Sequence, residues 1–210
     1  MNNLVIFTAF LDNSFAVKDS LKDCDFVICT DGGYDIALAY SVEPDLLMGD
    51  FDSVTSALPE DVEILRFPPE KDHTDLELAL MKAGELNAKN VTVIGGIGGR
   101  LDHTVANIQL LTAYADRFDS LILKDGKNTC FIIDGNNNSN MHIPASDNCY
   151  ISIFSLSEQC DILSFSGVKY PLENYVLTRD FPIGVSNEFK EKEAALCIKS
   201  GTLLVVISEK

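Results

Sequence analysis

Two aspartates flank a phenylalanine directly after a short apolar run, in the stretch MGDFDSV at 48–54. Like charges this close raise each other's pKa, and burying either one without a counter-charge costs several kcal/mol. Asp50 and Asp52 therefore lie either in water on a turn or around a bound cation. Carboxylate oxygens are ligands that Mg²⁺ prefers, usually a few of them together with water and substrate phosphates.

A second polar cluster, KDHTDLE at 71–77, stands where a helix is expected to begin. Thr74 or Asp72 would cap that helix, and Asp75 would favour its positive end. The same Asp75 offers a third carboxylate to the predicted cation, and Lys71 offers positive charge to a polyphosphate. Aspartate ligands do not by themselves select Mg²⁺ over Mn²⁺.

A third cluster is the glycine run GGIGGRLDHT at 95–104, which leaves an expected strand and enters an expected helix. It contains no G-x-x-x-x-G-K-[ST] pattern, and Leu101 stands at the third glycine position counted from Gly96, so it is not a G-x-G-x-x-G loop either. A plain turn is one reading. The other is a phosphate cradle, because glycine amides, a helix N-terminus and the forked donor Arg100 all favour bound anions.

The elements that position these clusters are visible in the first 125 residues. Apolar runs typical of short buried strands lie at 3–9, 25–30, 45–49, 62–67, 90–96 and 119–124. Apolar residues with helical spacing lie between them, namely Leu76, Leu80, Ala83 and Leu86, then Val105, Ile108 and Leu111. Such alternation predicts an α/β domain with a largely parallel sheet. All three polar clusters fall at strand ends, where open α/β sheets bind ligands.

The pattern changes after Asp125-Gly126. Short β runs follow, separated by Gly, Asn, Asp and Pro: NTCFIID, YISIFS, DILSFS, GVKYPL, AALCIKS and TLLVVIS. No amphipathic helix longer than two turns is expected among them. We therefore predict two domains, an α/β domain at 1–125 and a small all-β sandwich at 126–210.

Composition excludes some classes of function. The chain has 210 residues with 32 acidic and 16 basic side chains, a formal charge of −16, and no Lys/Arg cluster that would bind nucleic acid. The N-terminus lacks the basic region of a signal peptide, and no apolar stretch reaches the length of a membrane span. The six cysteines form no C-x-x-C pair, which favours free thiols in a reducing cytoplasm.

Six stretches, in the same order along the chain, resemble the thiamine pyrophosphokinase family, whose members are also called thiamine diphosphokinases. They are TDGG (30–33), PDLLMGDFDS (44–53), KDHTDLELAL (71–80), GGIGGRLDHTVANI (95–108), GVKYPL (167–172) and GVSNE (184–188). The resemblance implies an α/β nucleotide domain followed by a β-sandwich. It implies Mg²⁺-dependent transfer of a pyrophosphoryl group from ATP to the hydroxyl of thiamine, which gives thiamine diphosphate and AMP. It also implies a homodimer with thiamine sites between subunits.

The resemblance further implies roles for individual residues. A divalent cation would be held by Asp50, Asp52 and Asp75. Asp102, Arg100 and Lys71 would act near the reacting groups, with Asp102 either as the base for the hydroxyl proton or as a metal ligand. Nucleotide contacts would come from Asp31, Gly32, Gly33, Thr74, Gly98, Gly99 and Arg100. Thiamine contacts would come from Ser186, Asn187, Asp102 and Tyr170, although some family members carry Trp at the position of Tyr170 and this chain has no Trp.

Two rival readings of the same motifs remain open to test. A haloacid-dehalogenase-like phosphatase carries D-x-D-x-[TV] after an apolar strand, and LLMGDFDSV fits it, with Asp50 as the nucleophile. That reading leaves the glycine run and Arg100 unexplained. A non-catalytic module that senses nucleotide or thiamine would not need so many carboxylates. Thiamine-dependent consumption of ATP separates all three.

Overall fold

The computed structural model describes residues 1–12, 17–136 and 140–210, and the chain divides into two compact units, Met1–Lys127 and Asn128–Lys210. Within the described residues, none of the helices combines the length and the apolar character needed to cross a membrane.

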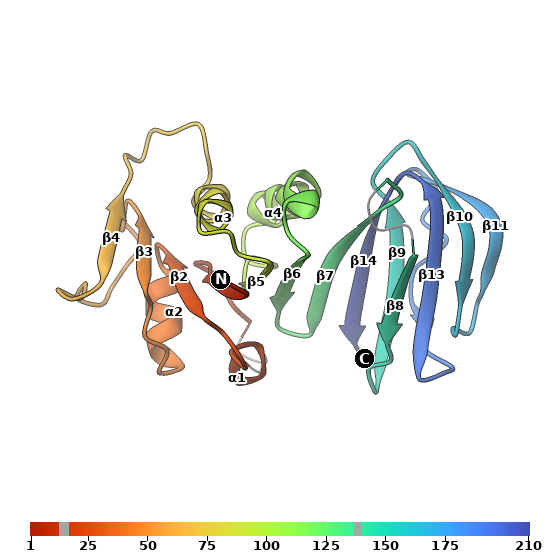
Figure 1. Ribbon diagram of the computed structural model, residues 1–210, viewed down its shortest axis with the longest axis horizontal. Coiled ribbons are helices and arrows are strands. Elements are labelled where there is room, and N and C mark those ends of the chain that lie inside the picture. Colours follow the sequence, from red (N-terminus) through yellow and green to blue (C-terminus); the bar gives the residue numbers. More distant parts are fainter. Residues whose placement is uncertain (13–16, 137–139) are drawn as a thin grey trace. The chain divides into compact units, whose positions relative to one another are not determined.

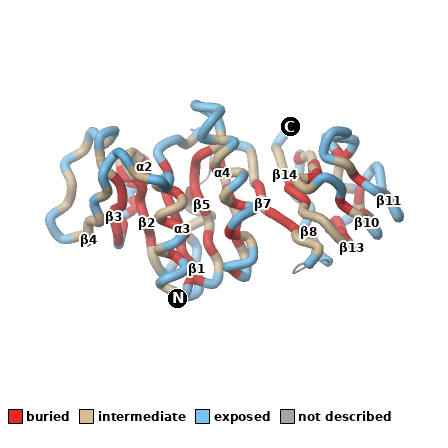
Figure 2. The backbone as a smooth tube through the Cα atoms, turned by 90° about the horizontal axis from the view of Figure 1, so that it is seen from above, coloured by how far each residue is buried: buried red, intermediate tan, exposed pale blue. Residues whose placement is uncertain are grey.

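A parallel sheet forms the centre of the first unit, with strand order β6-β5-β1-β2-β3-β4 (Figure 1). Its strands are β1 (Asn3–Phe7), β2 (Phe26–Thr30), β3 (Leu46–Gly49), β4 (Glu63–Arg66), β5 (Asn90–Ile94) and β6 (Ser120–Asp125). Each run predicted to be a strand in this part of the chain forms one. Strands β1, β2 and β3 are buried along nearly their whole length, as expected for strands covered on both faces. Figure 2 shows this buried backbone in red.

Helices cover both faces of this sheet (Figure 1). They are α1 (Val17–Ser20), α2 (Gly33–Ala39), α3 (Asp75–Glu85), α4 (Leu101–Tyr114) and a 3₁₀ turn, η1 (Ala115–Arg117). One buried cluster joins Phe7 and Cys29 of the sheet to Ala37 of α2. On α3, the residues Leu76, Leu80 and Ala83 are buried as predicted, with Ala79 beside them.

The predicted apolar face of α4 is wrong in part. Val105 is 48% exposed, and the buried positions are Asn107, Leu111 and Tyr114. Asn107 is only 8% exposed because its side-chain amide donates to the carbonyl of Gly96 at 2.8 Å. Hydrophobic periodicity does not predict that a polar amide is buried against a specific partner. The buried face of α4 is therefore rotated relative to the face that the apolar residues predict.

Two antiparallel sheets form the second unit, with strand orders β12-β9-β14-β7 and β11-β10-β13-β8. The strands are β7 (Asn128–Asp134), β8 (Asn140–Pro144), β9 (Cys149–Ser155), β10 (Gln159–Ser166), β11 (Leu172–Thr178), β12 (Asn187–Glu188), β13 (Glu193–Ser200) and β14 (Thr202–Glu209). One buried cluster takes Ile153 and Val205 from the first sheet and Phe165 and Leu196 from the second. Both sheets therefore share a single core.

The strand predictions for this unit are correct in most places. The run GVKYPL does not form a strand: its Val168 makes an isolated bridge to Phe189, and β11 begins only at Leu172, directly after Pro171. Proline has no N–H for a sheet ladder and so stands at the start of the strand. Strands β8, β11 and β12 are missing from the prediction.

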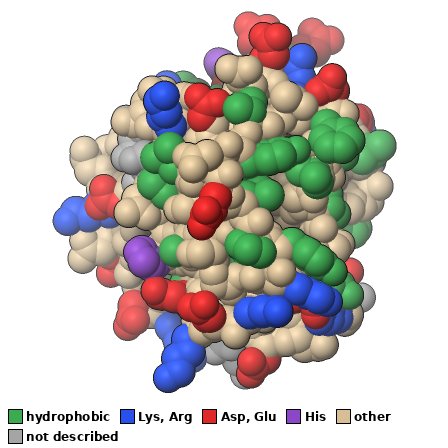
Figure 3. All heavy atoms as spheres, turned by 90° about the vertical axis from the view of Figure 1, so that its right-hand side faces the viewer, with side chains coloured by type: hydrophobic (Ala, Val, Ile, Leu, Met, Phe, Trp, Pro, Cys, Tyr) green, Lys and Arg blue, Asp and Glu red, His purple; other side chains and the backbone are tan. Residues whose placement is uncertain are grey.

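Thiols and apolar side chains complete this description. All six cysteines are thiols that form no disulfide: Cys29, Cys130, Cys149 and Cys160 are buried, whereas Cys24 and Cys197 are partly buried. Figure 3 shows apolar side chains gathered on one face of the second unit.

Candidate active site

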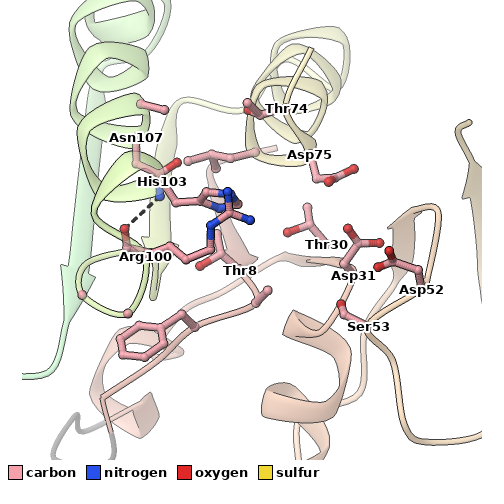
Figure 4. Close-up of a pocket in the computed structure, with 17 residues that line it drawn as sticks. Thr8, Thr30, Asp31, Asp52, Ser53, Thr74, Asp75, Arg100, His103 and Asn107 are labelled. Atoms are coloured by element: carbon pink, nitrogen blue, oxygen red, sulfur yellow. Dashed lines mark hydrogen bonds between the residues drawn. The ribbon is translucent and has the colours of Figure 1, made fainter. Parts of the chain in front are cut away.

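A cavity of about 570 Å³ opens in the first unit at the carboxyl ends of the parallel strands (Figure 4). Its lining comes from the segments that follow β1, β2, β3 and β5 and from the first turns of α3 and α4. This edge of the sheet is where the three polar clusters were expected to meet. In Figure 4, Asp31, Asp52 and Asp75 lie on one side of the cavity and Arg100 on the other.

The GDFD turn explains why glycine precedes the two aspartates. The amide of Phe51 donates to Asp31 Oδ1 at 2.9 Å, and the amide of Asp52 donates to Asp50 Oδ1 at 3.1 Å. A Cβ at Gly49 would stand 2.0 Å from Asp31 Oδ1, and Gly49 also has a φ of +146°. Only glycine lets the turn fold onto Asp31, so the two aspartates lie on a tight turn whose amides bind carboxylates.

Negative charge accumulates on this wall of the cavity. Burial raises the pKa of Asp31 to about 6, and repulsion from Asp75 and Asp50 adds to the rise, while the hydrogen bond from Phe51 opposes it. The raised pKa means that the ionised form of Asp31 lacks enough compensating positive charge. A bound cation would supply that charge.

Lys71 provides one positive charge to this wall. Its amine lies 2.6 Å from Asp75 Oδ1, and the Lys71 side chain is 14% exposed. Thr74, between them in sequence, is the N-cap of α3 and accepts a hydrogen bond from the amide of Glu77 at 3.2 Å. The capping reading of Thr74 is therefore correct, and Thr74 also lines the cavity.

The glycine run forms the opposite wall. The amide of Gly98 donates to Thr104 Oγ1 at 3.0 Å, which ties the run to the first turn of α4. A Cβ at Gly98 or Gly99 would stand 3.0 or 2.8 Å from the ring of Phe10, and both glycines have positive φ. The ring of Phe10 therefore packs against the bare backbone of the run, and a side chain at either glycine would meet it.

Arg100 and Asp102 are paired beside this wall. Arg100 donates to both carboxylate oxygens of Asp102, at 3.2 Å from Nε and 2.6 Å from Nη2. The pair is solvent-exposed, and Arg100 lowers the pKa of Asp102. Arg100 and its neighbour His103 line the cavity, whereas Asp102 is not part of the lining.

The predicted thiamine contacts of the second unit form a cluster of their own. Asn187 is 4% exposed: its Oδ1 accepts from the amide of Tyr170 at 2.9 Å, and its Nδ2 donates to the carbonyl of Tyr170 at 2.8 Å. Tyr170 itself is 61% exposed. Ser186 is exposed, with a φ of 57°, and its amide donates to Ser152 Oγ at 3.0 Å. Asn187 thus holds the backbone that presents Tyr170.

The cavity gathers many of the predicted residues of the first unit. Those that line it are Asp31, Asp52, Thr74, Asp75, Gly98, Gly99 and Arg100, whereas Asp50, Lys71, Gly32, Gly33 and Asp102 do not. Gly32 donates to Ser53 Oγ at 3.2 Å, and a Cβ at Gly33 would stand 2.3 Å from the carbonyl oxygen of Phe7, so Gly33 packs α2 against β1. Sequence reasoning missed the lining residues Thr8, Phe10, Thr30, Ser53, His103 and Asn107. His103, Asn107, Thr30 and Ser53 stand inside stretches quoted above for the family resemblance, whereas Thr8 and Phe10 lie at or just beyond the end of the first predicted strand.

The carboxylate wall suits a hard divalent cation. Its donors are oxygens, they belong to a region of surplus negative charge, and such donors favour Mg²⁺ or Mn²⁺. In the ranges 1–12, 17–136 and 140–210, no three Asp, Glu, His or Cys side chains already stand together as a metal site. Asp75 is turned to Lys71, so cation binding requires these side chains to rearrange.

Comparison with known proteins places both units in one family. The family description "Thiamin pyrophosphokinase, catalytic domain" matches residues 17–123, and "Thiamin pyrophosphokinase, vitamin B1 binding domain" matches residues 138–205. A thiamine pyrophosphokinase of Bacillus subtilis is 31% identical over 193 residues, which is 86% of this chain and 86% of that protein.

Solved structures agree with the sequence matches. The crystal structure of thiamine pyrophosphokinase from Bacillus subtilis is similar with a TM-score of 0.86 and 26% identity, covering 100% of both chains. That of thiamin pyrophosphokinase from Geobacillus thermodenitrificans has a TM-score of 0.84 and 26% identity, covering 100% of this chain and 98% of that one. On these matches, the chain belongs to the thiamine pyrophosphokinase family.

Proposed function

We propose that this member of the family forms thiamine diphosphate in the cavity of the first unit, by transferring a pyrophosphoryl group from ATP to the hydroxyl of thiamine. The chain is then a thiamine diphosphokinase that releases AMP. The observation that supports this use of the cavity most is its opposed charge. Carboxylates stand on one wall, and Arg100 and the glycine run stand on the other (Figure 4). A polyphosphate with a divalent cation matches both walls at once.

The carboxylate wall holds the cation in this proposal. Asp50, Asp52 and Asp75 are its ligands, and the raised pKa of the adjacent Asp31 supports the need for positive charge there. A bound Mg²⁺ would neutralise the charge that develops on the phosphate oxygens. In this proposal, the amine of Lys71 leaves its ion pair with Asp75 and binds a phosphate oxygen instead.

The glycine wall holds the nucleotide. Gly98, Gly99 and Arg100 contact the phosphates, and Asp31 and Thr74 lie across the cavity from them. Gly32 and Gly33 contribute indirectly, because they let α2 begin close to the sheet beside Asp31. Transfer of this kind depends on positioning and charge neutralisation more than on covalent chemistry by the protein.

The reaction balances without a further reactant. The hydroxyl oxygen of thiamine attacks the β-phosphorus of ATP, and the bond from that phosphorus to the oxygen shared with the α-phosphate breaks. AMP leaves with that oxygen, and the hydroxyl proton must be accepted. Asp102 is our candidate for the acceptor. Asp102 pairs with Arg100 at 2.6 Å and does not line the cavity with Asp31, Asp52 and Asp75, which supports the role of base over that of metal ligand.

Thiamine is bound by the second unit, a β-sandwich domain in this proposal, through Tyr170, Ser186 and Asn187, with Asp102 contributed by a catalytic domain. We propose a homodimer in which each thiamine site is shared between subunits. Large apolar side chains exposed in the second unit support a second copy as its partner; they are Leu163, Tyr170, Val176, Phe181, Ile183 and Val185. Six cysteines that form no disulfide support a cytoplasmic location.

One incubation tests the reaction. The protein, ATP, Mg²⁺ and thiamine are incubated, and nucleotides and thiamine esters are separated by chromatography. AMP and thiamine diphosphate in equal amounts are expected. ADP with thiamine monophosphate would contradict pyrophosphoryl transfer, thiamine-independent phosphate release would indicate the phosphatase, and no turnover with binding intact would indicate a sensor.

Subunit exchange tests the shared site. A variant with Ser186→Ala and Asn187→Ala is mixed with Asp52→Asn, and exchange is verified by native mass spectrometry. Mixed dimers would carry one site with both defects and one site with neither, so activity is expected to return in part. A mixture as inactive as its parents would place each site within one chain.

A further inference from the structure

A buried carboxylate outside the cavity holds together two of the loops that form the cavity wall. Asp125, the last residue of β6, is 1% exposed. Its Oδ1 accepts from the amide of Asp12 at 2.7 Å, and its Oδ2 accepts from the amide of Ile97 at 2.7 Å. Each oxygen therefore binds a different loop, and both bonds are short, as charge-assisted hydrogen bonds are.

Both loops belong to the cavity wall. Ile97 is the central residue of the glycine run, between Gly96 and Gly98, both of which line the cavity. Asp12 follows Phe10, whose ring packs against the run. A further bond joins the loops directly, because the amide of Gly96 donates to the carbonyl of Phe10 at 2.8 Å.

Stability alone does not account for a carboxylate at this place. Taking a charge out of water is costly. Burial and the nearby charge of Asp12 raise the pKa of Asp125, and hydrogen bonds from the backbone of Asp12, Ile97 and Gly126 oppose the rise. Among the residues described, Lys and Arg make no ion pair with it that would repay this cost. What the carboxylate does provide is a fixed position for two amides on two separate loops.

We propose that Asp125 is a positioning residue for the ATP phosphates. By holding the amides of Asp12 and Ile97, it fixes the glycine run in the shape that receives the polyphosphate, before the nucleotide arrives. The inference depends on the proposed function, since it takes the run at Gly98–Arg100 as the phosphate site. Asp125 itself touches neither substrate.

The test is Asp125→Asn, which keeps the volume but turns an N–H₂ group toward one of the two amides. Loss of one charge-assisted bond predicts an increase of about tenfold in KM for ATP. KM for thiamine and kcat at saturating ATP are expected to stay within about twofold, since a positioning defect for one substrate is overcome by its excess. Hydrogen exchange at Ile97 and Gly98 should accelerate in the variant.

A control is available at the other end of the same sheet. The exposed Asp25 also accepts two backbone amides, those of Asn2 at 2.8 Å and Asn3 at 3.0 Å, both at Oδ2, but lies far along the strands from the cavity edge. Asp25→Asn should lower the melting temperature without changing KM for ATP. If Asp125→Asn behaves as Asp25→Asn does, the carboxylate is merely structural and the inference is overturned.

A second variant separates this inference from the proposed function. Arg100→Met should raise KM for ATP if the run is the phosphate site. An unchanged KM for ATP in Arg100→Met overturns the site, and with it the role of Asp125. A raised KM in Arg100→Met with a normal KM in Asp125→Asn overturns only the role of Asp125. Should Asp125→Asn not fold, hydrogen exchange of the unaltered protein decides: the Ile97 amide is expected to be protected without ATP, and rapid exchange there contradicts a preformed loop.

Discussion

The amine of Lys71 and the carboxylate of Asp75 form a 2.6 Å ion pair across one turn of chain at the start of α3. Both residues were predicted for the active site, one for phosphate and one for the cation. The structure shows that each is the partner of the other. Under the proposed function, Lys71 would therefore compete with a metal ion for Asp75, and nucleotide binding would release Lys71 from this pair.

Removing Lys71 should strengthen metal binding while weakening catalysis. In Lys71→Gln, Asp75 loses its internal cation, and Mn²⁺ affinity without nucleotide is expected to rise about fivefold, the equivalent of ~1 kcal/mol for a partly exposed pair. KM for ATP should rise. Electron paramagnetic resonance titration with Mn²⁺ measures the first effect. Lys82→Gln is the control, because Lys82 pairs with Glu85 at 3.3 Å on the same helix; equal Mn²⁺ affinities in all three proteins would contradict the competition.

The paired aspartates should be dispensable for folding and not for activity. Asp50→Asn and Asp52→Asn are each expected to lower turnover about a hundredfold at moderate Mg²⁺, the loss of several kcal/mol of charge stabilisation. The metal-free variants should melt no lower than the parent, since one of two repelling charges is gone. The side-chain amide introduced by Asp50→Asn keeps an oxygen for the backbone N–H of Asp52, so the turn survives. A clearly lower melting temperature with normal turnover would show that the two aspartates stabilise the fold and do not bind a catalytic cation.

Asp31 should make the metal-free protein less stable as the pH rises. Its pKa is raised from 3.8 to about 6, so its contribution to stability is complete below about pH 4 and is lost as the pH passes through 6. Asp31→Asn removes this dependence. With chelator present, the variant should match the parent near pH 4 and exceed it by about 2 kcal/mol at pH 8 in urea unfolding. If the difference in unfolding free energy between variant and parent is the same at pH 4 and pH 8, ionisation of Asp31 does not destabilise the folded protein. Added Mg²⁺ should reduce this difference at pH 8.

Asp102→Asn should separate the two roles left open for this residue. The pKa of Asp102 is lowered by Arg100, so the carboxylate is ionised across the pH range of assay. As a base, its loss should reduce kcat about tenfold or more while leaving the Mg²⁺ dependence unchanged. Mg²⁺ titrations of activity check this, and a strongly raised Mg²⁺ requirement would show a ligand instead. Because the ion pair with Arg100 is exposed, the melting temperature should not change.

Asn187 and Tyr170 should share an effect on thiamine but not on stability. Tyr170→Ala and Asn187→Ala are both expected to raise KM for thiamine several-fold with KM for ATP unchanged, because Asn187 holds the backbone that presents the ring. Asn187→Ala also leaves the partly buried backbone N–H and C=O of Tyr170 without their partner and should cost about 1–3 kcal/mol of unfolding free energy. Tyr170 is exposed, so Tyr170→Ala should not destabilise. Steady-state kinetics and urea unfolding test both; a normal thiamine KM for Tyr170→Ala would remove it from the site.

Much of this site follows from the sequence because strand ends of a parallel sheet converge. The positions of Asp31, Asp52 and Asp75 follow from that rule together with short buried strands. The rule does not tell which residues after β1 reach the cavity, and so Thr8 and Phe10 were missed. It gives no sign either that Asp50 is absent from the lining, since that depends on the hydrogen bond it accepts in its own turn.

Interactions between side chain and backbone explain the other differences. The rotation of α4 depends on the Asn107 bond to Gly96, and the cluster at Asn187 depends on two bonds to the Tyr170 backbone. Each joins residues more than ten positions apart, where periodicity carries no information. Strand β8 was missed because its five residues end in Pro144 and only Ile143 among them is buried, too little for an apolar pattern.

Because most of its thiols are buried, alkylation of the cysteines can report whether the chain has unfolded. Alkylation requires a thiolate, and burial raises the pKa of Cys160 to about 11 and shifts the pKa of Cys29 further in the same direction. A brief pulse of iodoacetamide should therefore mark the native chain mainly at the partly buried Cys197, and more slowly at the partly buried Cys24, whose pKa burial also raises; a globally opened chain should be marked at all six cysteines. Counting mass increments per molecule would then distinguish opened chains from native ones in a mixture, without any engineered residue.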